Sequence, residues 1–308
     1  MHKFGTRMSD DQIAAIRTRL CPACNDGPVS YWAKKSACEL SRCCRCYALL
    51  CTKVPGPRET GRLYEQYHDA ARFTLASTVE TSLERLVSEA ERSRFTGRWL
   101  DFGYGEGGLL EVAQRHGWAC YGVEISRSML DYGSGKGWAV TSDPRGDPRF
   151  ANGTFDVITM IEVLEHVADP VSVLSEAAQW LRPGGLLYVT TPNARGLNCR
   201  ILGQAWSVVC PPQHLILWTP RALRAALART GFKVSRLRAE GFNPAEILAW
   251  VRGGRSAAES VNRYESGLAL SAALERSRVR RTAKAVVNRG LSALGFGDTL
   301  KVWASRAA

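Results

Sequence analysis

The chain has 308 residues and a formal net charge of +12, with 45% apolar and 23% charged residues. This composition predicts a globular protein with one large core and room for a small additional unit. No apolar run approaches the roughly 20 residues that a membrane-spanning helix needs, and the opening Met-His-Lys-Phe-Gly-Thr-Arg lacks the apolar stretch of a signal peptide, so we expect a cytoplasmic protein without a membrane span.

The first region, residues 17–55, is rich in cysteine. Seven of the ten cysteines lie between Cys21 and Cys51, and without an export signal such a cluster indicates a metal rather than disulfides. Two C-x₂-C pairs, separated by an 18-residue spacer, are typical of a zinc ribbon, because each pair offers two thiolates to one tetrahedral ion. We therefore predict a structural Zn²⁺ held by Cys21, Cys24, Cys43 and Cys46.

Three further cysteines leave the register of this zinc-ribbon-like head open. They are Cys38, Cys44 and Cys51, of which Cys44 directly follows a predicted ligand. A redox role for the C-x₂-C pairs is less favoured, since neither pair sits between a strand and a helix as in a thioredoxin site.

A helical linker or cap is expected over residues 59–95, after the breaker run Val54-Pro-Gly-Pro57. Its apolar residues recur at intervals of three and four, which is the period of a helix. These residues are Leu75, Val79, Leu83 and Leu86.

The main region, residues 96–242, alternates short apolar strands with helices. Strands are expected at 99–100, 119–123, 155–160, 186–190 and 233–237. Such alternation predicts an α/β fold with a mostly parallel sheet and helices on both faces. Residues 243–295 then read as a helical insertion rich in Ala, Leu and Arg, and residues 296–308 as the final strand of the core.

A glycine-rich turn follows the first core strand at Asp101. Gly103, Gly105 and Gly107 allow a sharp turn and a close approach of backbone to a ligand, and the following helix start adds unpaired N–H groups. The segment by itself leaves two cofactors open, because glycines at 103, 105 and 108 also satisfy the G-x-G-x-x-G spacing of NAD-binding proteins.

Four motifs in order resemble the class I S-adenosylmethionine (SAM)-dependent methyltransferases related to the ubiquinone-biosynthesis O-methyltransferases. The first is Trp99-Leu-Asp-Phe-Gly-Tyr-Gly-Glu-Gly107, with Tyr104 where these enzymes often carry Cys, and the second is Tyr121-Gly-Val-Glu-Ile-Ser126. The third runs from Phe155 to Val167, and the fourth is Leu181-Arg-Pro-Gly-Gly-Leu-Leu-Tyr-Val-Thr-Thr-Pro-Asn193. The resemblance favours SAM over NAD and implies a Rossmann-like, mostly parallel seven-stranded sheet.

The resemblance also implies roles for individual residues. The backbone of Gly103, Gly105 and Gly107 would cradle the methionine part of SAM, and Glu124 would bind the ribose hydroxyls. Asp101 would orient that loop or contact the amino group of SAM through water. Asp143 would lie beside the adenine, although the Pro/Gly-rich segment around it is equally typical of a solvated turn. The remaining implied cofactor contacts are Ile125, Met160 and Tyr67, the last in a segment that covers the cofactor in related enzymes and is equally typical of a plain packing helix.

A candidate catalytic centre follows the strand that ends near Met160. Glu162, Glu165 and His166 form an E-x-x-E-H sequence, and residues three and four apart share a face at a helix start. Carboxylates with an imidazole suit Mg²⁺ or Mn²⁺. The same pattern occurs in small-RNA 2′-O-methyltransferases and some quinone O-methyltransferases that use a metal, and His214 would complete the set.

The alternative is a centre without metal. Many methyltransferases carry Leu-Glu-His-Val at this place, with a structural Glu165 and with His166 near the substrate. His166 or His214 would then act as the base that removes a proton from the acceptor.

The leading functional hypothesis is methyl transfer to a hydroxyl of a small molecule, such as a natural product, a sugar or a quinone-like compound. Residues from Val251 to the end carry 11 Arg/Lys against 4 Asp/Glu, which is more typical of a solvated helical face than of a binding surface, and which would also suit an anionic or carrier-bound acceptor. Four of these basic residues form an Arg-dense stretch of the predicted insertion, namely Arg276, Arg278, Arg280 and Arg281. The alternatives are an RNA methyltransferase, which the zinc ribbon and basic tail favour but the lack of interleaved aromatics does not, and a non-catalytic scaffold.

Overall fold

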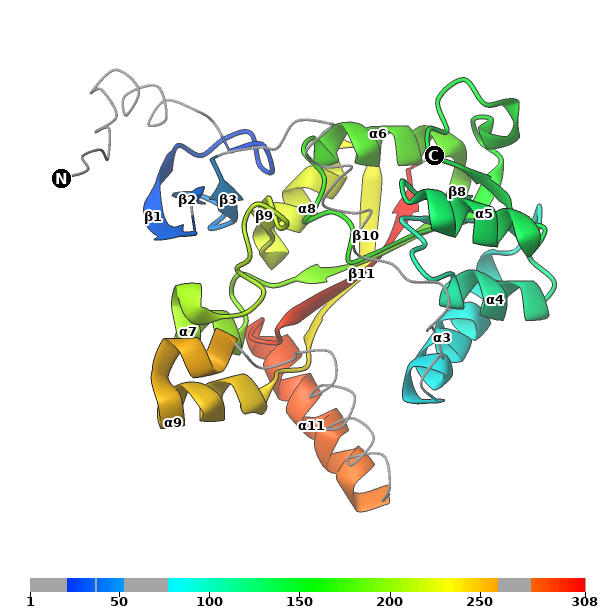
Figure 1. Ribbon diagram of the computed structural model, residues 1–308. Coiled ribbons are helices and arrows are strands. Elements are labelled where there is room, and N and C mark those ends of the chain that lie inside the picture. The colour runs from blue at the N-terminus through cyan, green and yellow to red at the C-terminus, as the bar shows by residue number, and fades with distance from the viewer. Residues whose placement is uncertain (1–20, 37, 53–76, 260–277, 308) are drawn as a thin grey trace.

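The computed structural model describes residues 21–36, 38–52, 77–259 and 278–307 (Figure 1). Its main sheet has seven strands in the order β10-β11-β8-β7-β4-β5-β6. The strands from β8 to β6 run parallel, and β11 is antiparallel to both of its neighbours, so the predicted fold class is confirmed. The strands are β4 (Arg98–Phe102), β5 (Ala119–Val123), β6 (Ala139–Thr141), β7 (Phe155–Ile161), β8 (Leu181–Pro192), β10 (Phe232–Glu240) and β11 (Thr299–Arg306).

The central strand β7 shows why the sheet forms here. All but the last of its residues are buried, as expected of a parallel strand covered on both faces. At the edge, β6 has only three residues and is half-buried, which is why no apolar run marked it as a strand in the sequence.

Helices cover both faces of the main sheet. One buried cluster joins the sheet to α3, α4 and α5, and the other joins it to α6 and α8. Asp169 and Thr219 accept amide hydrogen bonds at the starts of α6 and α8, each followed directly by proline, so both starts are fixed locally. The helices are α3 (Ser77–Ala90), α4 (Gly108–Arg115), α5 (Arg127–Gly135), α6 (Pro170–Trp180), α7 (Leu197–Leu202), α8 (Pro220–Arg229), α9 (Pro244–Glu259) and α11 (Arg278–Leu294).

The predicted linker and insertion are described in part. α3 buries Leu86 and Val87 against the core, whereas Leu75 and Tyr67 lie outside the described residues. α9 and α11 stand between β10 and β11 in the chain, and α9 packs on α7, which follows β8 at the carboxyl edge of the parallel strands. Among the described helices, none combines the length and apolarity needed to cross a membrane.

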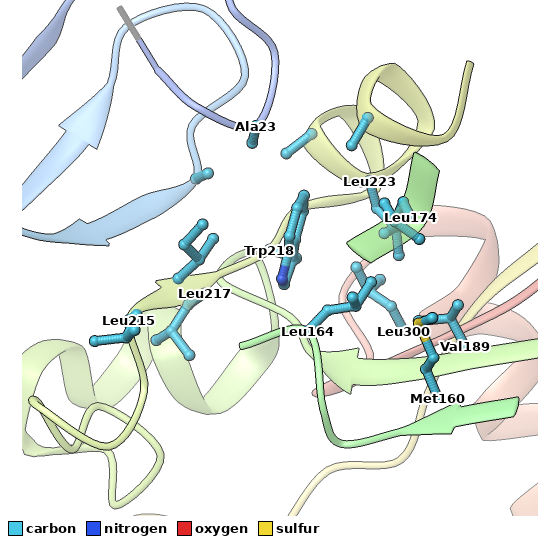
Figure 2. Packing of buried hydrophobic residues seen from close by; sticks show 14 of the residues in the cluster. Ala23, Met160, Leu164, Leu174, Val189, Leu215, Leu217, Trp218, Leu223 and Leu300 are labelled. Carbon is cyan, nitrogen blue, oxygen red and sulfur yellow. The ribbon is translucent and has the colours of Figure 1, made fainter. Parts of the chain in front are cut away.

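The cysteine-rich head is built into the core. Its strands β1 (Val29–Lys35), β2 (Cys38–Cys43) and β3 (Leu49–Cys51) form an antiparallel sheet with β9 (Ile216–Leu217), which belongs to the main region of the chain. The hydrophobic cluster is continuous from Ala23 in the head through Trp218 to Leu300 in the main sheet (Figure 2). The head therefore shares both a strand and a hydrophobic core with the main region.

Candidate functional site

The glycine-rich turn lies between β4 and α4, at the carboxyl edge of the sheet. Gly103, Gly105 and Gly107 have φ values of 72°, 51° and 79°, a backbone region that side chains disfavour. A Cβ atom on Gly103 would lie 2.7 Å from Val163 Cγ2, and one on Gly107 would lie 2.6 Å from the Trp138 ring. Glycine is thus required both by conformation and by close packing.

The turn is tied to the acidic end of β5. Glu124 Oε2 accepts a hydrogen bond from the amide of Gly105 at 3.0 Å, and Oε1 accepts from the amides of Ile125 and Ser126. The amides of Gly103 and Gly107 donate to backbone carbonyls. Because these three glycine amides have protein acceptors, the turn would offer a ligand its remaining carbonyl oxygens.

Asp101 is buried beneath this turn. Its Oδ1 accepts a hydrogen bond from Thr159 Oγ1 at 2.5 Å, and Thr159 Oγ1 in turn accepts from Trp99 Nε1 at 3.1 Å. Burial raises the pKa of Asp101 to about 7, with a further contribution from the negative charge of Glu124, and the hydrogen bond from Thr159 opposes the rise only in part. A buried carboxyl group that ionises near neutral pH is suited to receive a cationic group.

The other predicted cofactor residues differ in accessibility. Ile125 is half exposed at the end of β5, a position suited to ligand contact. Asp143 is exposed and paired with Arg145, as expected of a solvated turn. Met160 is fully buried in the core beside Val189 (Figure 2), so contact of its side chain with a cofactor stays a prediction that this packing does not favour.

The side chain of Tyr104 packs against α5 and β5. Its side chain is buried, its hydroxyl donates to the carbonyl of Met129 at 2.6 Å, and its ring lies edge-on to Trp138. Burial raises the pKa of this hydroxyl. The residue that departs from the family motif is thus a packing residue between α5 and β5.

The predicted histidines meet beyond the end of β7. The His166 and His214 ring centroids are 4.6 Å apart. Nδ1 of His166 lies 3.0 Å from the carbonyl of Gln213, and Nδ1 of His214 lies 2.7 Å from that of Val208. Since a carbonyl only accepts, each Nδ1 carries the proton of the neutral ring, and each Nε2 is then the unprotonated nitrogen.

One of the two predicted glutamates joins the histidines. Glu165 is fully buried, accepts from Thr191 Oγ1 at 2.8 Å, and places Oε1 3.9 Å from His166 Nε2. One ligand atom each from Glu165, His166 and His214 lies within 4.8 Å of the others. Opposite ligands of an octahedral Mg²⁺ are about 4.2 Å apart, so a small inward movement would suit one ion.

Glu162 is not in this group. The expected helix start over residues 162–166 is wrong, because these residues form a turn and α6 begins only at Pro170. Glu162 has a φ of 54° and accepts a hydrogen bond from Thr190 Oγ1 at 3.0 Å. The spacing that would align Glu162 with Glu165 on one helix face therefore does not apply.

The four predicted zinc ligands converge in the head. Sγ of Cys21 and Cys46 are 3.6 Å apart, and Sγ of Cys24 and Cys43 are 3.7 Å apart. A tetrahedron with Zn–S bonds of 2.3 Å has edges of about 3.8 Å, so the thiolates fit one zinc ion. Cys38, Cys44 and Cys51 are not part of this group, which resolves the register.

Other features of the head suit thiolate ligands. Two backbone amides donate to Cys43 Sγ, at 3.3 and 3.4 Å, and a Cβ on Gly27 would lie 2.5 Å from this sulfur. The hydrogen bond with Cys46 lowers the pKa of Cys21 to about 5, despite burial, and raises the pKa of Cys46. Among the four thiols, that of Cys21 is thus favoured in its ionised form at neutral pH, whereas burial raises the pKa of Cys24.

Sequence reasoning missed the residues that hold the functional side chains. Thr159 binds Asp101, Thr191 binds Glu165, and the carbonyl of Gln213 binds His166. The two threonines had a signal, since each is a buried hydroxyl in a mostly apolar stretch of its strand. The Gln213 contact is made by backbone and had none.

Comparisons with known proteins agree with this geometry. A family profile described as a methyltransferase domain matches residues 74–237, more than half of the chain. The ubiquinone biosynthesis O-methyltransferase of Parvibaculum lavamentivorans is 30% identical over 165 residues, which cover 48% of this chain and 63% of that protein. The one from Marinobacter nauticus is 31% identical over 171 residues, covering 50% of this chain and 71% of the relative.

Among solved structures, the cyclase SpnF aligns with a TM-score of 0.52 at 21% identity, covering 83% of this chain and 97% of that one. This likeness supports the fold alone. The match to the Parvibaculum enzyme spans slightly less than two thirds of that enzyme's length. The profile and the relatives, which select SAM over NAD, show that the chain belongs to the class I SAM-dependent methyltransferases.

Proposed function

We propose that the protein transfers the methyl group of SAM to a hydroxyl of a small-molecule acceptor. The observation that carries this proposal is the meeting of His166 and His214 next to the glycine turn. Val163 connects the histidine pair to the glycine turn, because it packs on Gly103 and lies three residues before His166. Methyl transfer requires an acceptor held in line with the sulfonium and a group that takes its proton, and a base beside the turn would meet the second requirement.

The residues around the turn fit the methionine and ribose parts of SAM. An ammonium group needs acceptors, which the turn carbonyls and the ionised form of Asp101 supply. Glu124 is held by three backbone amides, so its carboxylate is already oriented to accept ribose hydroxyls at its free lone pairs. Ile125 would cover the ribose or adenine from its half-exposed position.

His166 is the better placed of the two histidines to act as base. Burial lowers its pKa, against the opposing effect of the Gln213 carbonyl, so the ring is neutral near pH 7. Its Nδ1–H is donated to that carbonyl, so Nε2 is the nitrogen that would take the proton of the acceptor. His214, in edge contact with this ring, would steer the acceptor or share the proton.

The same three side chains also fit a divalent cation of the Mg²⁺ type. When bound, such an ion would lower the pKa of the acceptor hydroxyl. Glu165, His166 and His214 would hold it, with Thr191 and the two carbonyls orienting them. Glu162 would join only after releasing Thr190.

In the head, we propose a structural zinc ion on Cys21, Cys24, Cys43 and Cys46. Four thiolates complete a tetrahedral shell, so no position is left for a substrate. The S···S distances and the amide hydrogen bonds to Cys43 support this assignment.

Calorimetry with S-adenosylhomocysteine and with NAD⁺ tests the cofactor, and we expect binding of the first only. Turnover of SAM with a panel of catechols, demethylated quinols and hydroxylated sugars then tests the acceptor. His166→Asn should reduce kcat by roughly 100-fold or more with little change in affinity for S-adenosylhomocysteine. Full activity of this variant would overturn the role of His166.

Chelation separates the two versions of the centre. If a cation assists, EDTA and Glu165→Gln should each reduce kcat strongly while Glu162→Ala retains activity, with zinc content checked so that loss from the head is not mistaken for loss from the site. Full activity after chelation would remove the cation and leave the histidine base.

An RNA acceptor stays a prediction. Arg276 lies outside the described residues, and the structure does not describe the side chains of Arg278, Arg280 and Arg281. Steeply salt-dependent binding of RNA would favour that acceptor, and no binding at low salt would exclude it.

A further inference from the structure

The segment that carries His214 is attached to the head on one side. β9 begins two residues after His214 and pairs with β3, through Leu49 with Leu217 and Leu50 with Ile216. The amide of Cys51 also donates to the carbonyl of Leu215 at 2.8 Å. The head therefore supplies the strand partner for the residues that directly follow His214.

The attachment leads straight to a predicted zinc ligand. Thr219 is fully buried, and its hydroxyl donates to the carbonyl of Cys46 at 2.6 Å. Only two residues separate Cys46 from β3, and the amide of Cys43 donates to Ala48 within this turn. The position of the Cys43–Cys46 turn thus fixes both the start of β3 and the residue that follows Trp218.

On its other side, the same segment is attached to the His166 turn. The carbonyl of Glu165 accepts from the amides of Leu215 and Ile216, at 2.7 and 3.2 Å, while Gln213 accepts from His166. Trp218, fully buried, fills the space between Ala23 of the head and the core residue Leu164 (Figure 2). Residues 213–218 thus lie between the head and His166.

We propose that the cysteine-rich head is a positioning element for the histidine pair: zinc on Cys21, Cys24, Cys43 and Cys46 holds β3, and β3 holds β9 and His214 against His166. A two-residue strand has too few hydrogen bonds to keep its register alone. A metal-bound turn has a fixed geometry, because metal binding supplies the folding free energy of such small units. The functional consequence of this coupling rests on the proposed function of the histidines.

Hydrogen exchange tests the coupling without needing an acceptor. In Cys21→Ser, which loses a zinc ligand, the amides of Leu215 and Ile216 should exchange roughly tenfold faster or more, whereas those of β4 should change little. The affinity for S-adenosylhomocysteine should stay within about twofold, since no hydrogen bond joins the glycine turn to the part of the head that the structure describes. Cys44→Ser is the matched control, because Cys44 is exposed and outside the cysteine group.

A second pair of variants leaves the cysteines intact. Thr219→Val removes two hydrogen bonds, the one to the Cys46 carbonyl and the one that caps α8. Thr219→Ser keeps both hydrogen bonds. We expect one zinc per chain in each, faster exchange at Leu215 and Ile216 in the valine variant, and recovery in the serine variant.

Unchanged exchange over residues 213–218 in both Cys21→Ser and Thr219→Val would overturn the proposal. Activity separates it from the proposed function. If exchange is faster in these variants but the unchanged, zinc-bound protein transfers no methyl group, the positioning role of the head is retained and the proposed chemistry of the histidines is rejected. If the protein transfers a methyl group, Cys21→Ser and Thr219→Val should lower kcat and leave the affinity for SAM unchanged.

Discussion

Two buried aspartates at opposite ends of the parallel strands, which we call the carboxyl edge and the amino edge of the sheet, have pKa values shifted in opposite directions. Asp101 lies near the carboxyl end of β4, and burial raises its pKa to about 7. Asp156 lies at the amino end of the neighbouring strand β7, and there the outcome is reversed. Burial would raise its pKa, but hydrogen bonds from the amides of Phe95 and Gly97 and from Arg182 outweigh that effect and lower it.

The difference has a direct meaning for stability. For Asp156, stabilisation is present above pH 3.8 and is lost as the pH falls through its lowered folded-state pKa. For Asp101, whose pKa is raised, stability without a ligand falls as the pH rises from 3.8 to about 7. At the amino edge the ionised aspartate therefore stabilises the fold, whereas at the carboxyl edge ionisation of the aspartate lowers stability.

Breaking the amino edge should have the largest effect. Asp156→Ala leaves Arg182 and the amides of residues 95–97 without their acceptor, so we expect a loss of about 3–5 kcal/mol in the free energy of unfolding at neutral pH. Denaturant unfolding measures it. The difference from the unchanged protein should shrink below pH 3.8. Asp131→Ala, at an exposed pair with Arg127, is the control, and an equal loss there would contradict the comparison.

At the carboxyl edge, the glycine turn should respond through ligand affinity. Gly107→Ala adds a methyl group at φ 79° and against Trp138, so the turn must shift, and we expect affinity for S-adenosylhomocysteine to fall by roughly 30-fold or more. Gly137→Ala is a matched control, since Gly137 has φ 80° and open space around its Cβ position. It should cost about 1 kcal/mol in stability with unchanged affinity. Equal affinities for both variants would show that the close packing is not needed.

Asp101 gives the pH dependence of this edge. In the proposed function Asp101 receives the ammonium group of SAM, which would favour the ionised carboxylate, and the fraction of that form rises through about pH 7. The affinity for SAM should therefore increase about tenfold between roughly pH 6 and pH 8, as calorimetry can measure. Asp101→Asn should bind more weakly and lose this slope. The same slope in the variant would assign the pH dependence to another group.

The glycine turn at the carboxyl edge was predictable from sequence because it depends only on residues that are close together in the chain. The glycine turn needs only a strand, three glycines and a helix within a few residues, and all three glycines adopt positive φ. Period-two alternation would also have separated Thr159 from Met160, because neighbours on a strand point to opposite faces. Thr159 binds Asp101, while Met160 packs in the core.

The pairing of β3 with β9 was not predictable. β9 has two residues, too few to show a period, and its partner lies more than 160 residues earlier in the chain. The grouping of Glu162 with Glu165 failed for a related reason, since it assumed a helix where the chain makes a turn. His166 and His214 were paired correctly because each follows a strand that ends at the same edge, which topology alone determines.

The smallest effect is expected at Tyr104, within the glycine turn but directed away from it. Tyr104→Phe removes the hydrogen bond to Met129 and keeps the ring against Trp138, so it should cost about 0.5–1.5 kcal/mol in stability. Affinity for S-adenosylhomocysteine should stay within about twofold, since the hydroxyl is bonded on the α5 side of the turn. Thermal unfolding and calorimetry on one preparation measure both quantities. A tenfold loss of affinity with unchanged stability would mean that the hydroxyl serves the ligand, and the division of this turn into a packing side chain and a binding backbone would then be wrong.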